Sequence, residues 1–98
     1  MRADKTAPGL KIEDFEDRSL LIVDDDDPFR DRLARAMEKK GFKVNSAKTV
    51  DIARELVKKS SPAFAVVDLR LEGGNGLDVV KKINESKKDS RIVMLTGY

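Results

Sequence analysis

Three short apolar runs end in residues whose side chains could do metal and phosphate chemistry. Residues 20–23 (LLIV) lead into four aspartates, residues 63–67 (AFAVV) into Asp68, and residues 91–95 (RIVML) into Thr96. Such runs are typical of buried strands in a parallel sheet, whose carboxyl ends all lie at one edge. We therefore expect the carboxylates and the hydroxyl to converge there. Hard carboxylate oxygens around a small site favour Mg²⁺ and phosphate chemistry.

The four consecutive aspartates after the first run are expected to have different roles. By base rate such a run is a solvated acidic turn, but like charges at the end of a buried strand repel unless a cation lies between them. We interpret Asp24 and Asp25 as the pair that faces this cation. Asp26 is expected to face solvent or the metal's outer shell. Asp27 is expected to cap the following helix, with Pro28 at the first helical position.

Asp68 is the candidate nucleophile of the site. A single aspartate after a strand is often only a turn residue, but residues 73–76 (GGNG) follow closely, and glycines let a backbone approach and turn sharply. A carboxylate beside bound Mg²⁺ can attack a phosphoryl group and hold it as an acyl phosphate. Thr96 taken alone is a strand-capping threonine. Beside an acyl phosphate, its hydroxyl could donate to a phosphoryl oxygen.

The composition excludes several other classes of function. The 98 residues allow one domain with a modest core, and the 20 basic and 18 acidic side chains are spread along the chain without a basic stripe. Direct nucleic-acid binding by this segment is therefore poorly supported. The chain has no cysteine and no histidine, which excludes disulfides, thiolate zinc sites and Ser-His or Cys-His catalysis. No apolar run is long enough to span a bilayer, so no membrane association is expected and the cytoplasm is the expected location.

The elements that must position these residues alternate between strand and helix. Residues 1–19 are polar and are expected to form a flexible leader. Strands are expected at residues 20–23, 42–47, 63–67 and 91–95. Between them lie a helix that ends at Gly41, a second helix capped by Thr49, a glycine-rich loop at 69–75 and a third helix at 76–87. The expected inward-facing residues are Phe29, Leu33, Ala36 and Met37 in the first helix, Ile52, Ala53, Leu56 and Val57 in the second, and Leu77, Val80 and Ile83 in the third.

This alternation predicts an α/β fold with a doubly wound parallel sheet of the flavodoxin-like type. Right-handed crossovers would place helices on both faces of the sheet. In the flavodoxin-like strand order the first and third strands are neighbours at the point where ligands bind. Asp24, Asp25 and Asp68 end those two strands, so the fold itself would bring them together.

These motifs resemble the receiver domain of bacterial two-component response regulators, a CheY-like fold. The resemblance covers residues 20–98 and is carried by LLIVDD, by VVDLRL with the following GNGLD, and by VMLTG, in this order and spacing. The strings VDDDDPF, AVVDLRLEGGNGLDVV and RIVMLTGY further resemble the redox-responsive regulators of the RegA, PrrA and ActR type. The resemblance implies a signalling domain rather than an enzyme, whose chemistry is limited to its own phosphorylation and dephosphorylation.

The resemblance also implies a role for each matching residue. Asp68 matches the aspartate that accepts a phosphoryl group from a sensor histidine kinase. Asp24 and Asp25 match the acidic pair that positions Mg²⁺, with Asp25 the more direct ligand. Asp68 itself and the backbone carbonyl of Arg70 complete the metal shell, and Thr96 matches the switch hydroxyl.

The chain departs from the family after Thr96. A receiver continues through a further helix, a strand that ends in a lysine and a last helix, so residues 20–98 match a partial receiver without an output domain. Because no lysine follows Thr96, phosphoryl acceptance is expected to be slow or absent. DNA would be reached only through an output domain that this chain lacks. The last strand, 91–95, would be an exposed edge, so a homodimer or swapped assembly through it is expected.

Two other functions are compatible with parts of the sequence. A haloacid-dehalogenase-type phosphatase would use Asp24 and Asp26 as an Asp-x-Asp pair, together with Thr96. That interpretation requires threonine or valine where Pro28 stands, requires a later acidic pair and a lysine motif, and leaves Asp68 unexplained. The other alternative is an interaction fragment that folds and binds but never carries phosphate.

Overall fold

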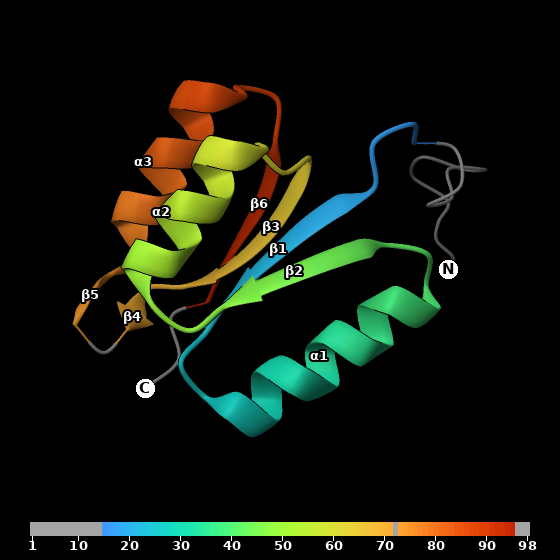
Figure 1. Cartoon of the computed structure of the whole chain (residues 1–98), viewed down its shortest axis with the longest axis horizontal. Coiled ribbons are helices and arrows are strands. Elements are labelled where there is room, and N and C mark those ends of the chain that lie inside the picture. Colours follow the sequence, from blue (N-terminus) through green and yellow to red (C-terminus); the bar gives the residue numbers. More distant parts are fainter. Residues whose placement is uncertain (1–14, 72, 96–98) are drawn as a thin grey trace.

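The computed structural model describes residues 15–71 and 73–95, which form a parallel sheet with helices on both faces. The sheet has the strand order β2-β1-β3-β6 (Figure 1). Its strands are β1 (Ser19–Val23), β2 (Lys43–Ala47), β3 (Phe64–Asp68) and β6 (Arg91–Leu95). The helices are α1 (Asp27–Lys39), α2 (Val50–Lys59) and α3 (Gly76–Ser86). The predicted α/β alternation and the neighbouring positions of the first and third strands are confirmed.

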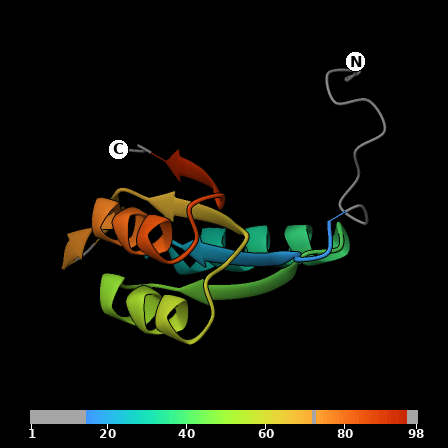
Figure 2. The same ribbon diagram turned by 90° about the horizontal axis from the view of Figure 1, so that it is seen from above.

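The sheet separates α1 from the other two helices. Figure 1 shows α1 on one side of the strands, and Figure 2 shows α2 and α3 next to each other on the opposite side. Side chains alternate between faces along a strand, so Leu21 and Val23 of β1 join the core under α2 and α3. Leu20 and Ile22 are equally buried but lie on the other face, which α1 covers. The central strand β1 is therefore buried on both sides.

The helix starts explain one difference from the sequence prediction. Asp26, not Asp27, is the N-cap of α1, because its Oδ1 accepts a hydrogen bond of 3.1 Å from the backbone N–H of Phe29. Asp27 is the first residue of the helix and binds Arg30 instead. Thr49 caps α2 as predicted, through a hydrogen bond of 3.1 Å from the N–H of Ile52.

The buried stripes of the helices are narrower than their apolar patterns. Ile52 and Leu77 were expected to face the core, but their side chains are 45% and 43% exposed. A helix lying on a sheet buries only the residues that face it, and additional apolar residues beside that stripe remain exposed. The buried helix residues are Val50, Ala53 and Val57 in α2 and Gly76, Val79, Val80 and Ile83 in α3. In α1 no residue is fully buried, and Ala36, which was expected to face inward, is exposed.

The segment predicted as a glycine-rich loop contains a small hairpin. Strands β4 (Arg70–Leu71) and β5 (Gly74–Asn75) pair in antiparallel fashion. Gly73 lies at the turn with φ of +79°, a conformation that side-chain-bearing residues rarely adopt. Leu71 is buried, so the hairpin is attached to the core rather than projecting freely.

The amino end of the sheet is closed by aromatic side chains. The ring of Phe64 has edge-to-face contacts with Phe15 and Phe42, at centroid distances of 5.3 and 5.1 Å. The guanidinium of Arg91 lies over the Phe15 ring, 5.3 Å from its centroid. Part of the predicted leader therefore contacts the sheet, and β1 itself begins at Ser19. Residues 1–14 of that leader lie outside the described residues.

Two further features concern the expected pairing through the last strand and the expected lack of a membrane-spanning segment. Strand β6 is one of the two edge strands of the sheet in the described part of the chain, and its Val93 and Met94 are 57% and 50% exposed. Among the described residues, no helix combines the length and apolar character that a membrane crossing requires.

Candidate metal and phosphoryl site

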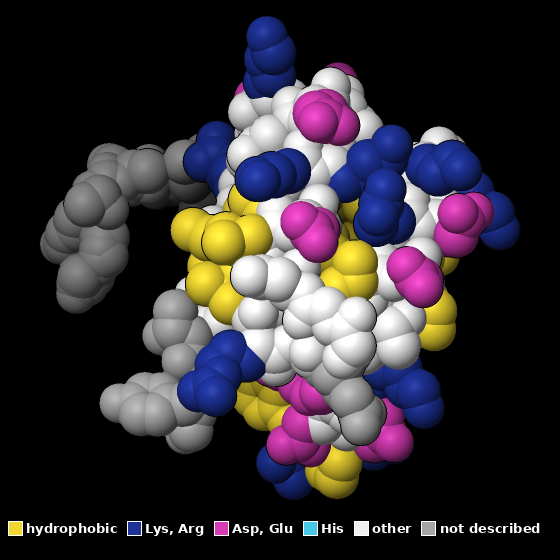
Figure 3. Space-filling view, turned by 90° about the vertical axis from the view of Figure 1, so that its left-hand side faces the viewer, with side chains coloured by type: hydrophobic (Ala, Val, Ile, Leu, Met, Phe, Trp, Pro, Cys, Tyr) yellow, Lys and Arg dark blue, Asp and Glu magenta, His cyan; other side chains and the backbone are white. Residues whose placement is uncertain are grey.

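Three carboxylates meet at the carboxyl edge of the sheet. Strands β1 and β3 are paired up to Val23 and Val67, so the residues that follow them lie side by side. One oxygen from each of Asp24, Asp25 and Asp68 lies within 4.8 Å of the other two. Figure 3 shows acidic side chains gathered at the lower end of the face that it draws. The structure therefore brings together the three aspartates that the sequence singled out for metal binding.

Asp24 is the buried member of this group. Its side chain is 6% exposed, and its Oδ1 accepts a hydrogen bond of 2.9 Å from the backbone N–H of Asp26. Its own N–H donates to the carbonyl of Ala47, which ties the end of β1 to β2. Burial raises the pKa of the Asp24 carboxyl, and the negative charges of Asp68 and Asp25 raise this pKa further. A cation at this place would relieve both effects.

Asp68 is held by the backbone on either side of it. Its Oδ1 accepts a hydrogen bond of 3.0 Å from the N–H of Arg70. Gly76 at the start of α3 approaches the Asp68 carbonyl so closely that an added Cβ would collide with its oxygen. The N–H of Leu69 donates to the carbonyl of Leu95, which connects this turn to β6. The turn that carries Asp68 is therefore fixed by three neighbouring segments.

Of the two remaining predicted site residues, Arg70 lies within the described part of the chain and Thr96 does not. Arg70 directly follows the Asp68 turn, pairs with Asn75 in the hairpin and is exposed. Its carbonyl as a metal ligand stays a prediction. Thr96 lies outside the described residues, and β6 ends one residue before it, at Leu95, which pairs with Asp68 in the sheet register.

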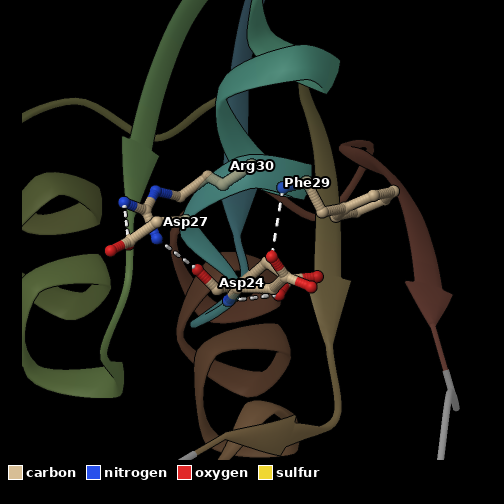
Figure 4. A network of polar contacts seen from close by, with 5 residues as sticks. Asp24, Asp27, Phe29 and Arg30 are labelled. Carbon is tan, nitrogen blue, oxygen red and sulfur yellow. Dashed lines mark hydrogen bonds and ion pairs between the residues drawn. The ribbon is translucent and has the colours of Figure 1, made fainter.

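Arg30 is a site neighbour that the sequence analysis missed. Its Nη1 donates a hydrogen bond of 2.8 Å to the backbone carbonyl of Asp24, and its Nη2 contacts Asp27 Oδ1 at 2.6 Å (Figure 4). The hydrogen bond and positive charge of Arg30 lower the pKa of the Asp27 carboxyl. The i, i+3 spacing of an aspartate and an arginine on one helix is a signal that could have indicated this pair. Nothing in that spacing indicates the contact with the Asp24 carbonyl.

The chemistry of the three carboxylates fits a hard divalent cation. Carboxylate oxygens are preferred ligands of Mg²⁺ and Ca²⁺, and the three oxygens lie close enough to be shared by one ion. The absence of histidine and cysteine from the whole chain makes softer metals poorer candidates. Asp24, Asp25 and Asp68 are the residues that would hold the ion.

Comparison with known sequences identifies a family. The family model described as "Response regulator receiver domain" matches residues 20–98. The photosynthetic apparatus regulatory protein RegA of Cereibacter sphaeroides is 55% identical over 92 residues, covering 94% of this chain and 50% of that protein. The acid tolerance regulatory protein ActR of Rhizobium meliloti is 51% identical over 82 residues, covering 84% of this chain and 42% of that protein. The chain thus spans about half the length of the curated relatives that it matches.

Solved structures with the same fold include two that carry ligands. A response regulator from Burkholderia pseudomallei with a phosphorylated aspartic acid, calcium ion and citrate has a TM-score of 0.78 and 35% identity, covering 84% of this chain and 48% of that one. TrrA from Thermotoga maritima in complex with Mg²⁺ and BeF has a TM-score of 0.74 and 27% identity, covering 83% and 70% of the two chains. These likenesses favour a receiver over the haloacid-dehalogenase alternative. The chain belongs to the response regulator receiver domain family.

Proposed function

We propose that this chain accepts a phosphoryl group on Asp68, with Mg²⁺ held by Asp24 and Asp25. The observation that carries the proposal is the convergence of one oxygen from each of these three side chains within 4.8 Å. The phosphoryl donor is the phosphohistidine of a sensor histidine kinase. With no histidine of its own, the chain is a recipient in this relay and not a donor.

The transfer would proceed by attack of an Asp68 carboxylate oxygen on phosphorus. The phosphorus–nitrogen bond to the donor imidazole breaks, and the departing imidazole keeps that electron pair and is protonated. The hydrogen bond from the Arg70 N–H orients the attacking carboxylate. When bound, Mg²⁺ supplies positive charge that offsets the carboxylates and the phosphoryl oxygens. Asp24 and Asp25, whose oxygens lie within 4.8 Å of an Asp68 oxygen, would hold the ion there.

Two features of similar proteins support this assignment. The Burkholderia pseudomallei structure contains a phosphorylated aspartic acid with calcium, and the TrrA structure contains Mg²⁺ with BeF. For this chain we propose Mg²⁺ as the cofactor, the Arg70 carbonyl as a further ligand, and the Thr96 hydroxyl as the group that contacts the new phosphoryl oxygens. Leu95, the last residue of β6, is paired with Asp68 in the sheet register, and Thr96 is the next residue in the sequence.

The wider role that we propose is control of transcription in the cytoplasm. Relatives such as RegA and ActR are regulatory proteins, and this chain spans about half of their length. DNA would be contacted by a separate output domain and not by residues 20–98. The mixed charge of the chain, with 20 basic and 18 acidic side chains, is consistent with a domain that does not itself bind DNA.

We also propose that two copies of the chain associate through β6. This strand has a neighbour on only one side within the described part of the chain, and its exposed N–H and C=O groups could pair with a second copy. The exposed side chains of Val93 and Met94 lie on opposite faces of the strand, so such pairing would cover both.

The test of the main proposal is phosphorylation measured by intact mass. The chain is incubated with Mg²⁺ and acetyl phosphate, alongside Asp68→Asn and the control Asp78→Asn, whose aspartate is an exposed residue in the first turn of α3. Wild type and Asp78→Asn are expected to gain one phosphoryl group, and Asp68→Asn none. A folded wild type that gains no mass contradicts the proposal. It would favour the alternative of an interaction fragment that never carries phosphate. An adduct that persists in Asp68→Asn would favour Asp24 as the nucleophile, as in the phosphatase alternative.

A further inference from the structure

The side chain of Arg30 is tied to the turn that carries the candidate metal ligands. Arg30 lies in the first turn of α1, and its side chain is only 14% exposed. Figure 4 shows it reaching from the helix to the end of β1. The two contacts go to the Asp24 carbonyl and to the Asp27 carboxylate. Both terminal nitrogens of the side chain are therefore bound to protein groups and do not extend freely into solvent.

The contact with the carbonyl matters more than the ion pair. Asp27 is 63% exposed, and an exposed ion pair of this kind contributes little to stability. The Asp24 carbonyl, in contrast, belongs to the peptide group that joins Asp24 to Asp25. Whatever fixes this peptide fixes how the two carboxylates are presented relative to each other. The same guanidinium contacts the carbonyl through Nη1 and Asp27 through Nη2.

Arg30 provides one of three hydrogen bonds that hold Asp24. The N–H of Asp24 donates to Ala47, its Oδ1 accepts from the N–H of Asp26, and its carbonyl accepts from Arg30. Asp26 in turn caps α1 through the N–H of Phe29. The N–H, the carbonyl and one carboxylate oxygen of Asp24 are thus tied to a strand, to the helix and to the turn. Arg30 is the member of this set that connects the helix to the metal-site peptide by a side chain.

We propose that Arg30 is a positioning residue for the cation site, and that Asp27 orients it. The inference rests on the proposed function, because it assigns how the Asp24–Asp25 peptide is held for Mg²⁺ binding. Groups that orient metal ligands commonly change metal affinity by about 10-fold to 100-fold when they are removed. Arg30 also carries a positive charge near an acidic site. The direction in which its removal changes the affinity for Mg²⁺ therefore distinguishes a charge effect from a positioning effect.

The first test is Mg²⁺ affinity by isothermal titration calorimetry on the whole chain. Removing a positive charge should tighten cation binding if Arg30 acts only through its charge. If Arg30 positions the peptide, Arg30→Ala should raise the Kd by about tenfold instead. Arg30→Lys keeps the charge but cannot contact both partners in the same geometry, so it should also weaken binding. Asp27→Asn should weaken it less, since the amide oxygen can still accept a hydrogen bond.

The matched control is Arg32→Ala, which removes the same charge from an exposed position on the same helix. Its Kd should stay close to that of the wild type. Equal or tighter Mg²⁺ binding by folded Arg30→Ala overturns the proposal. If Arg30→Ala does not fold, Arg30→Lys decides by the same criterion.

A second measurement separates this inference from the proposed function. Amide hydrogen exchange by NMR, without metal, reports the opening of the bond from the Asp26 N–H to Asp24. Arg30→Ala should accelerate exchange at Asp26, while the amides of α3 keep their wild-type rates. A wild type that binds no Mg²⁺ contradicts the proposed function, and the exchange rate then still decides whether Arg30 holds the turn. Unchanged exchange at Asp26 overturns the inference in either case.

Discussion

Strands β1 and β6 are both short apolar runs, yet they have opposite surroundings. The residues from Leu20 to Val23 are between 0% and 4% exposed, whereas Val93 and Met94 are 57% and 50% exposed. β1 has a strand on each side and helices over both faces, and β6 has only β3 beside it in the described part of the chain. Apolar sequence therefore identifies a strand but does not say how many neighbours cover it.

This difference matters for the site, because β1 leads directly into two of the carboxylates whereas β6 only supports the turn beside the third. The carboxylates of Asp24 and Asp25 follow the buried strand β1, and Asp68 ends β3 beside it. β6 contributes the carbonyl of Leu95, which accepts a hydrogen bond from the turn after Asp68. The ligand positions thus follow the buried central strands of the sheet, and the exposed strand β6 contacts only the turn after Asp68.

The largest expected effect comes from removing core volume in β1. Ile22→Ala should lower the free energy of unfolding by about 2–5 kcal/mol, because the side chain is fully buried and a cavity remains. Val93→Ala in β6 should cost less than about 1 kcal/mol, since much of that side chain already contacts water. Urea denaturation monitored by circular dichroism measures both. Similar losses for the two variants would contradict the contrast between the strands.

A smaller effect is expected at the carboxylate that ends β1. Burial raises the pKa of Asp24 in the folded chain above the unfolded value of 3.8, so the folded state binds this proton more tightly. Without metal, the contribution of Asp24 to stability therefore falls as the pH rises from 3.8 through the raised folded pKa, and remains unfavourable at neutral pH. Asp24→Asn should accordingly raise the melting temperature at pH 7 in the absence of metal. The gain should disappear at a pH below 3.8, where both states are protonated.

Two controls make the Asp24 result specific. Asp31→Asn removes a charge from an exposed position on α1 and should leave the melting temperature nearly unchanged. Saturating Mg²⁺ should stabilise the wild type more than Asp24→Asn, because the ion binds the folded carboxylate. A lower melting temperature for metal-free Asp24→Asn at pH 7 would count against the burial effect.

The smallest change in stability is expected at the edge strand, where the effect is on association instead. A wild-type chain that pairs through β6 should show a mass above that of the monomer by size-exclusion chromatography with light scattering. Met94→Lys places a charge on the exposed strand and should give a monomer, with a stability change within about 0.5 kcal/mol. Ile52→Lys, a matched change at an exposed apolar residue of α2, should leave the association intact. A monomeric wild type at every concentration would refute pairing through β6.

The parallel topology and the convergence of the aspartates could be predicted from the sequence, because both follow from strands that alternate with helices. The cap of α1 could not, since Asp26 and Asp27 are equally suitable cap residues by type. The choice is associated with the position of Arg30, which binds Asp27 and reaches Asp24. Such a contact depends on where a long side chain ends in three dimensions.

Burial within the helices was predicted less well for a related reason. The exposed positions of Ile52 and Leu77 depend on how each helix is rotated on the sheet, and neighbouring apolar residues make several rotations equally plausible from sequence. The β4–β5 hairpin was likewise hidden, because its strands are two residues long and rich in glycine. The placement of Thr96 stays a prediction, since that residue lies outside the described part of the chain.

The close approach of Gly76 to the Asp68 carbonyl has a consequence for mutational tolerance. Any side chain at this position would have to displace the backbone of the turn that carries Asp68. The nearest obstacle at Gly74, by comparison, is the side chain of Val50 and not the backbone. In a library that samples every amino acid at each position, position 76 should therefore accept glycine alone. Such a library would classify Gly76 with the functional residues. Its role, however, is only to lack a Cβ atom where the Asp68 backbone passes.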